Sequence, residues 1–346
     1  MKKILLIAAV IFLASCSGSP RYIAVTGYAQ GGTYSVKINM KGVSASPEEL
    51  REGIDSILTL VDTTLSGYNK LSVLSRFNAG ETIRPNGIFT EIYSLSRKWY
   101  EASGGAFDVA AGPLFDAWGF GFKNDRLPSD EAVKEILSSC GMGRLKPSVE
   151  DALSPDGTLA PKDLLVGEGA LPVLNFNAIA QGYTADLVAG WLRTKGVKDM
   201  LVDIGEIFCD GLNPSGKPWS VGVDRPVDGN DTPGKDIEGI WMSDGGPRGV
   251  VTSGNYRKFY VVDGVKYSHS IDPRSGYPAR NTLLSATVVA PDATTADAVA
   301  TWCMVIGLEK SKELISSKAE LESLLIYSEG EQMKEWASEG FLTSGL

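Results

Sequence analysis

The sequence predicts a single α+β domain of mixed or antiparallel sheets with packed helices, extending over residues 22–346. Strand and helix signals interleave along the chain without a regular β-α alternation, which argues against a parallel α/β fold. Asp263-Gly264 separates two runs of aromatic and β-branched residues and is the strongest hairpin signal in the chain. No internal repeat or long linker divides the chain, so we expect one compact unit.

Residues 1–15 are predicted to be a signal peptide and are excluded from the fold. An apolar run from Ile4 to Leu13 follows two lysines and is too short to span a bilayer comfortably. The run ends in Leu-Ala-Ser-Cys16, which resembles a bacterial lipobox, where cleavage precedes a cysteine that becomes lipid-modified. Residues 16–21 would then be the lipidated cysteine and a short tether. We therefore expect an exported lipoprotein, membrane-anchored through Cys16 and facing the periplasm; a plain signal peptide with an incidental cysteine is the alternative.

The N-terminal half predicts two strands followed by three helices. Residues 21–40 are rich in Val, Ile, Tyr and Thr on both sides of a Gly-Gly turn, which is typical of a strand pair. Ser46 offers an N-cap, with Pro47 at the first helical position and Glu49 at the capping-box position. Apolar residues at helical spacing predict this helix to residue 65, a second through 88–99 that stops at Gly104-Gly105, and a third from Ser129 to Gly141.

The C-terminal half predicts mainly strands. Helices are expected at about 179–195 and over 295–306, and strands over 200–208, 219–223, 256–262, 265–271, 282–290 and 323–327. Segments 252–256 and 268–276 flank the hairpin and contain turn formers, so either could be purely structural.

Composition and charge exclude several classes of function. Thirty-three Lys and Arg against 42 Asp and Glu give a net charge of −9, which repels phosphate backbones and makes nucleic acid an unlikely partner. The only histidine, His269, rules out a multi-histidine metal site, and the four cysteines form no C-x-x-C pair. Three cysteines remain after Cys16, and we expect them to be buried free thiols. His269 has the pKa range of an acid or base, but a packed, hydrogen-bonded histidine is the alternative.

A candidate cation site lies in the last predicted helix. Asp297 and Thr301 are four residues apart, so their oxygens share one helix face and could converge on a hard cation. Magnesium suits such a sparse site because it retains waters and binds phosphate oxygens. The alternative is that Asp297 only decorates the first helical turn.

Other candidate segments have structural alternatives. The run 211–218 has the glycine spacing of a phosphate loop, but proline follows Lys217 and a strand follows the loop, so we interpret it as a turn. Residues 177–183 place small side chains where a strand passes into a helix, which suits either a ligand or helix packing. Residues 104–114 form a glycine-flanked loop whose single carboxylate is Asp108.

In combination, the segments resemble the ApbE family of flavin transferases. The resemblance rests on five blocks in order behind the lipobox: 66–68 with 75–78; 104–114; 177–186; 252–256; and 267–278, closed by 291–293 and 296–298. It implies a single catalytic domain that, with magnesium, transfers FMN from FAD to a Ser or Thr hydroxyl of an acceptor protein and releases AMP. The implied acceptor is a subunit of a membrane redox complex.

The resemblance also implies roles for individual residues. Asp297, Thr301 and the carbonyl of Ala178 correspond to metal ligands, and Asp297 and His269 to catalytic groups. The implied cofactor-binding residues are Tyr68 beside the flavin, Asp108 in the nucleotide loop, Ala178, Gln181 and Asp186 at the cofactor wall, and Ser253 and His269 near the reacting phosphate.

Two departures from the family pattern bear on function. Gln181 stands where many relatives have lysine, and the 202–207 run is one glycine shorter than usual, which could impair flavin binding. Two other functions therefore stay open at this point: an FAD pyrophosphatase that gives FMN and AMP, and a lipid-anchored FAD-binding protein without turnover.

Overall fold

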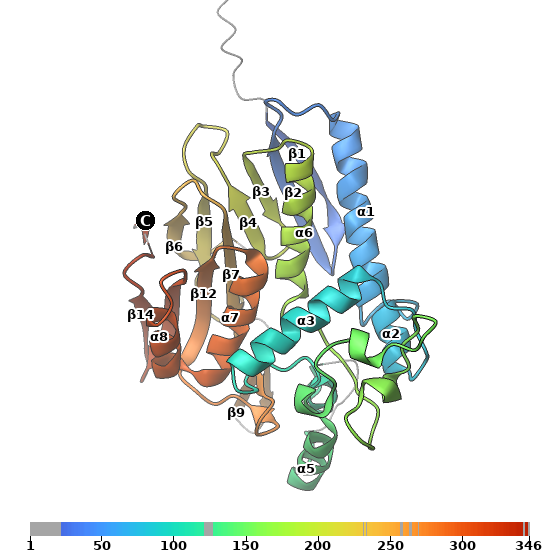
Figure 1. Cartoon of the computed structure of the whole chain (residues 1–346). Coiled ribbons are helices and arrows are strands. Elements are labelled where there is room, and N and C mark those ends of the chain that lie inside the picture. Colours follow the sequence, from blue (N-terminus) through green and yellow to red (C-terminus); the bar gives the residue numbers. More distant parts are fainter. Residues whose placement is uncertain are drawn as a thin grey trace, which may run out of the picture.

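The structure, a computed structural model, describes residues 22–120, 127–230, 232, 234–256, 259–262, 265–268, 270–341 and 343–344. An eight-stranded sheet forms the middle of the molecule, with helices covering the face turned toward the viewer in Figure 1. A three-stranded sheet packs against the other face through a shared apolar cluster. This arrangement confirms the predicted α+β class and the single domain.

The central sheet is antiparallel at every strand pair and has the order β1-β2-β3-β4-β7-β12-β13-β14. Its strands are β1 Tyr22–Ala29, β2 Gly32–Asn39, β3 Met200–Asp203, β4 Ile207–Asp210, β7 Arg248–Gly254, β12 Leu283–Ala290, β13 Glu322–Glu329 and β14 Gln332–Ala337. The predicted hairpin over 21–40 is confirmed. The prediction of one strand over 200–208 is wrong, because the chain turns between β3 and β4. Gly205 adopts φ +95° there and donates its N–H to Asp203.

Side chains of the central strands alternate between two cores, as the pleat of a sheet requires. Val250, Val289 and Leu324 face the small sheet, whereas their neighbours Val251 and Leu325 face the helices. The small sheet consists of β5 Ser220–Asp224, β6 Ile237–Met242 and β15 Thr343–Ser344, and two hairpins are separate from it: β8 Phe259–Val262 with β9 Val265–Ser268, and β10 Ile271–Asp272 with β11 Tyr277–Pro278. The β8–β9 pairing confirms the predicted hairpin, although residues 263–264 lie outside the described residues.

The five predicted helices, which are α1, α3, α5, α6 and α7 below, begin and end close to the predicted signals, whereas α2, α4 and α8 were not predicted. The helices are α1 Pro47–Leu65, α2 Val73–Asn78, α3 Gly87–Ala102, α4 Gly112–Ala117, α5 Asp130–Ser139, α6 Ala180–Thr194, α7 Ala293–Ile306 and α8 Leu308–Ser316, with short 3₁₀ turns at Met142–Arg144, Glu150–Ala152 and Pro161–Leu164. The capping box of α1 is confirmed in both directions between Ser46 and Glu49. No helix among the described ranges is long and apolar enough to cross a membrane.

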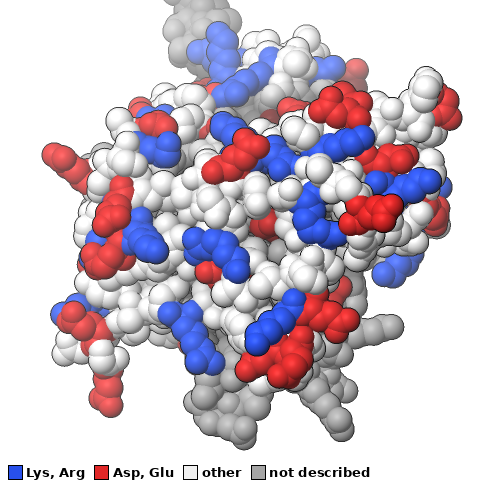
Figure 2. Space-filling view, turned by 60° about the horizontal axis from the view of Figure 1, so that its bottom comes forward, with Lys and Arg blue, Asp and Glu red and all other residues white. Residues whose placement is uncertain are grey.

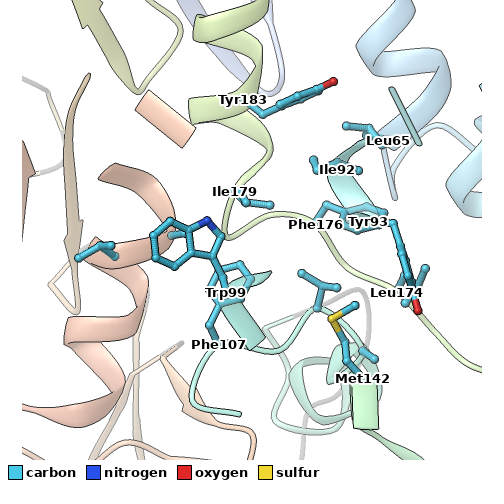
Figure 3. Close-up of a cluster of buried hydrophobic side chains, with 14 of the residues drawn as sticks. Leu65, Ile92, Tyr93, Trp99, Phe107, Met142, Leu174, Phe176, Ile179 and Tyr183 are labelled. Atoms are coloured by element: carbon cyan, nitrogen blue, oxygen red, sulfur yellow. The ribbon is translucent and has the colours of Figure 1, made fainter. Parts of the chain in front are cut away.

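An aromatic cluster beneath α3 fixes the start of α6. Figure 3 shows Trp99 and Phe107 on one side of Ile179, with Phe176 and Tyr93 on the other. All five side chains are buried. Because Phe176 and Ile179 bracket the segment that leads into α6, burial of these rings holds that segment in a defined position.

Candidate active site

The candidate site is built around the crossing of α6 and α7. Gly182 lies in the first turn of α6, and a Cβ added there would be 2.3 Å from the carbonyl oxygen of Ala293 and 2.8 Å from the Cβ of Asp297. Gly249 on β7 meets the start of α7 just as closely, since its added Cβ would be 2.3 Å from the Ala293 nitrogen. Glycine at these two positions lets α7 pack directly on the backbone of both neighbours.

Asp297 is the buried carboxylate at this crossing. Its side chain is 5% exposed, and its Oδ2 accepts the N–H of Gly182 at 3.0 Å. Burial raises the pKa of Asp297, and the nearby Asp186 carboxyl raises it further. Among the described residues, no positive side chain is recorded beside Asp297, so a bound cation would supply the charge that an ionised carboxylate needs in this position.

The donor set around Asp297 is sparse and made of oxygens. Thr301 lies one helical turn further along α7 and is partly buried. Within the described ranges, no group of three or more His, Cys, Asp and Glu side chains gathers around a possible metal position. A cation here would therefore rest on one carboxylate, a hydroxyl and backbone oxygens, a combination that fits magnesium better than zinc or calcium.

Ala178 lies two residues before the first residue of α6 and is partly buried against the aromatic cluster. The carbonyl of Phe176 accepts the N–H groups of Ile179 and Ala180, at 3.0 and 2.9 Å. Ile179 then enters the helix at φ −152° and ψ −17° without a side-chain cap. The segment is thus held by its backbone, next to the Gly182 amide that binds Asp297.

Asp186 is engaged with the start of α7. Its two oxygens accept the N–H groups of Ala293 and Thr294, at 2.9 and 2.8 Å, and the Thr294 hydroxyl also donates to it. Burial raises the pKa of Asp186 to about 6. Asp292 accepts the next amide, that of Thr295. The N-terminus of α7 is therefore occupied by protein carboxylates, and Asp186 joins α6 to α7 beside Asp297. Its contact with the cofactor stays a prediction.

Gln181 and the short 202–207 run, which are the two departures from the family pattern, are in contact with each other. The Gln181 side-chain amide donates to the Ile204 carbonyl at 3.1 Å, and a Cβ added at Gly205 would be 2.8 Å from the same nitrogen. The uncharged Gln181 therefore ties the first turn of α6 to the short β3–β4 turn. Sequence reasoning treated these features as separate.

Gln30 is a neighbour of the site that sequence reasoning missed. It is the one non-glycine residue with positive φ in the part of the chain that the structure describes, at +52°, and its side chain donates to Thr184 at 2.7 Å. Thr184 in turn donates to the Ala180 carbonyl at 2.6 Å. The tip of the β1–β2 hairpin thus supports the first turn of α6. The pattern Gln-Gly-Gly indicated a turn and did not indicate this long-range contact.

Ser253 lies on the helix-covered face of the sheet, since it is two residues from Val251 and pairs with Ala286 of the same core. The eight steps along α7 from Ala293 to Thr301 rise about 12 Å, and the four steps along β7 from Gly249 to Ser253 rise about 13 Å. Because α7 starts beside Gly249 and then packs along β7, Ser253 and Thr301 lie at a similar distance along β7 from that starting point.

Asp108 and Tyr68 lie on segments away from the α6–α7 crossing, and in the part of the chain that the structure describes no hydrogen bond joins either of them to Asp297. Asp108 accepts the amides of Ala110 and Met142, and burial raises its pKa to about 6. Tyr68 is 67% exposed in the loop between α1 and α2. His269 lies outside the described residues, and its role stays a prediction.

A shallow groove between α3, α7 and α8 is lined in part by Trp302, Ile306 and Arg274. Trp302 and Ile306 are five and nine positions after Asp297, so they project from α7 about 140° and 180° away from it. The groove is therefore separate from the candidate site. Figure 2 is turned so that the bottom of Figure 1 comes forward, and basic and acidic side chains are interspersed over the face it shows.

Comparisons with known proteins identify the same family that the sequence motifs resemble. The model of the ApbE family matches residues 30–325. A protein of Vibrio cholerae serotype O1 named FAD:protein FMN transferase is 32% identical over 97% of this chain and 96% of its own. The protein of that name from Escherichia coli K12 is 31% identical over 98% and 96%.

Solved structures show the same similarity. The flavin transferase ApbE from Vibrio cholerae has a TM-score of 0.77 at 30% identity, covering 93% of this chain and 100% of that one. The apo form of the Pseudomonas stutzeri flavinyl transferase ApbE has a TM-score of 0.78 at 31% identity, covering 92% and 95%.

Proposed function

The chain belongs to the ApbE family and is a FAD:protein FMN transferase, and from that premise we propose how its residues carry out the transfer. In the proposed reaction, the oxygen of an acceptor Ser or Thr hydroxyl attacks the FMN phosphorus of FAD. A new phosphoester bond forms, the bond to the AMP phosphate breaks, and AMP leaves. The hydroxyl proton passes to a base, and His269 is our candidate for it.

The observation that carries the mechanism is the buried Asp297 carboxylate at the α6–α7 crossing. We propose that Asp297, the Thr301 hydroxyl and the Ala178 carbonyl hold Mg²⁺. Bound there, the ion would neutralise charge on the pyrophosphate oxygens. Gly182 orients the carboxylate through its amide, and the tight packing of α7 on α6 keeps that geometry before substrate arrives.

The surrounding residues are proposed to position FAD. Tyr68 presents an exposed ring for the flavin, and Ser253, at a similar distance along β7 to Thr301, contacts the reacting phosphate. Gln181 and Asp186 hold the first half of α6 to its neighbours and form the wall behind the nucleotide. Asp108 is proposed to order the loop that contacts the nucleotide through its bonds to Ala110 and Met142.

We further propose that the enzyme is exported, anchored in a membrane through lipidated Cys16 and faces the periplasm. The apolar run that ends in Leu-Ala-Ser-Cys16 supports this proposal. An acceptor on the same side would be a membrane redox-complex subunit with an accessible Ser or Thr.

The test is intact-mass spectrometry of a candidate acceptor domain incubated with residues 17–346, FAD and MgCl₂, with AMP measured in parallel. We expect a mass gain of one FMN and equimolar AMP. An acceptor whose target Ser or Thr is replaced by alanine is the control and should gain no mass. AMP without an adduct on any acceptor would instead indicate a pyrophosphatase, and bound FAD with neither product would indicate a flavin-binding protein.

A further inference from the structure

Three loops surround the point at which the described chain begins. The Tyr22 hydroxyl donates to the carbonyl of Leu212 in the β4–β5 turn. Asp199, at the end of the α6–β3 loop, accepts from the Asn39 side chain at 2.8 Å and from the Leu212 amide at 2.9 Å. A Cβ added at Gly196 would be 3.6 Å from the carbonyl of Gly42, which brings the β2–α1 loop to the same place. We call this end of the molecule, formed by residues 40–46, 195–199 and 211–218, the tether end.

The tether end carries exposed lysines in an acidic protein. Lys41, Lys195, Lys198 and Lys217 are all exposed, and no salt bridge is recorded for them among the described residues. Lys195 extends over the ring of Trp191, with its nitrogen 5.3 Å from the ring centroid. These charges stand out against a net charge of −9 for the whole chain.

The acidic groups at this end are mostly engaged in local structure. Both oxygens of Asp199 accept hydrogen bonds from within the tether end. Glu49 accepts the Ser46 amide in the α1 capping box, whereas Glu48 is exposed beside it. Hydrogen bonds with Ser46 lower the pKa of Glu49, and the charge of Lys195 lowers it further, so Lys195 has one acidic neighbour. No salt bridge is recorded among the described residues for Lys41, Lys198 or Lys217.

Apolar side chains are exposed among these lysines. Leu212 is 42% exposed, and Met242, which pairs with Ser220 just beyond the β4–β5 turn, is 39% exposed. Cationic side chains with long apolar stems beside exposed Leu and Met are typical of surfaces that lie on lipid headgroups.

The candidate site lies away from the tether end. Lys195 directly follows α6, whereas Gly182 and the Asp297 contact lie at the start of that helix. The 15 residues of α6 span about 22 Å. In Figure 1, α1 and α6 run side by side along this direction, with the beginning of the described chain at the top.

We propose that the tether end docks on an anionic phospholipid surface and orients the enzyme with its transfer site away from the bilayer. This inference rests on the proposed anchoring through Cys16, because the six residues from Cys16 to Arg21 can extend at most about 21 Å. The tether thus holds the lysines within reach of the headgroups, where each contributes electrostatic attraction. It follows that the acceptor presents its Ser or Thr some 20 Å or more above the membrane.

The test uses residues 17–346, which retain every described residue and lack the lipid. Co-sedimentation is measured with phosphatidylcholine vesicles, with and without roughly one third phosphatidylglycerol, at about 50 and 500 mM NaCl. We expect binding only to the anionic vesicles at low salt. The variant Lys41→Glu, Lys195→Glu, Lys198→Glu, Lys217→Glu should lose at least about tenfold in partition coefficient.

The matched control changes four exposed lysines elsewhere: Lys98→Glu, Lys134→Glu, Lys162→Glu and Lys310→Glu. It alters net charge equally, and Lys98 lies over Trp99 much as Lys195 lies over Trp191. Equal losses in the two variants, or no preference of the parent for anionic vesicles, would overturn the proposal.

FMN transfer to a soluble acceptor separates this inference from the proposed function. Transfer should be the same for the parent and the tether-end variant in solution, and the same for the parent with and without anionic vesicles. Inhibition by the vesicles would place the site against the membrane and contradict the orientation. Absence of transfer from the parent and from every variant would refute the proposed reaction. The co-sedimentation results would then still support or overturn docking on the membrane by themselves.

Discussion

Burial of the Asp297 carboxylate is unfavourable for its ionised form, and a bound cation would offset this cost. Because burial raises its pKa, the carboxyl is favourable to the fold when protonated, and that contribution is lost as pH rises and the group ionises. Asparagine has the same shape and can still accept the Gly182 amide. It removes only the charge.

We therefore predict that Asp297→Asn abolishes magnesium-dependent FMN transfer, while its stability at pH 8 without magnesium equals or exceeds that of the parent. Thermal unfolding supplies the second readout: MgCl₂ with FAD should raise the Tm of the parent and leave the variant unchanged, because a ligand stabilises only a state that binds it. Transfer at the parental rate in the variant would remove Asp297 from the metal site.

Asp108 makes a pH-dependent contribution that can be measured without substrate. Burial raises its pKa to about 6, above the ordinary value of 3.8, so its favourable contribution is complete below pH 4 and is lost as pH rises through 6. Asp108→Asn can retain the bonds to Ala110 and Met142 through Oδ1.

From pH 4 to pH 7, we predict that the parent loses about 2–3 kcal/mol of unfolding free energy relative to Asp108→Asn. Urea unfolding of both proteins across this range is the measurement. A difference between them that stays constant with pH would show that the carboxyl titrates alike in the folded and unfolded chains.

For single residues, the sequence reveals neighbours within one helix but not contacts between distant segments. The interval from Asp297 to Thr301 is a helical turn and was sufficient to place both oxygens on one face. The partners of Asp186 are more than 100 positions away, at Ala293 and Thr294, and depend on how α6 and α7 pack. A sequence pattern carries no signal for that contact.

Among the elements, the α6–α7 pair depends on backbone contact at Gly182. We predict that Gly182→Ala lowers stability by about 1–3 kcal/mol and impairs transfer, because the methyl group would overlap the Ala293 carbonyl. Gly190 is the matched control: it lies in the same helix, is exposed and has open space around its Cβ position. Gly190→Ala should raise stability by about 0.5–1 kcal/mol and preserve transfer. Denaturant unfolding and transfer assays check both, and equal behaviour of the two variants would contradict tight packing at Gly182.

Elements with their own boundary signals were predicted well, whereas strands defined by their neighbours were missed. The capping box predicted the start of α1, and Ser129 predicted that of α5. In contrast, β7 contains Gly249, Ser253 and Gly254, which favour a turn in isolation. It is a strand because β4 and β12 pair with its two edges and α7 packs against Gly249.

At the scale of the whole molecule, the sequence predicted one α+β domain but could not reveal its layers. Helix and strand periodicity is local, while the division of the apolar residues into separate cores follows from the order of strands in the sheet. The three described cysteines illustrate the consequence. Their burial as free thiols was predicted and is confirmed, but each belongs to a different core cluster: Cys140, Cys209 and Cys303.

Because no two of these thiols share a cluster, a disulfide between them would require loss of the fold. We predict three free thiols in denatured residues 17–346, even after export to an oxidising compartment, and a Tm that dithiothreitol does not change. In the native protein these thiols should react slowly, since burial raises the pKa to about 11 for Cys140 and about 12 for Cys209 and Cys303. Thiol titration before and after denaturation makes the comparison. One free thiol instead of three would mean that two cysteines from different core clusters had formed a disulfide. That result would contradict the separation of these clusters in the fold that positions α7 and Asp297.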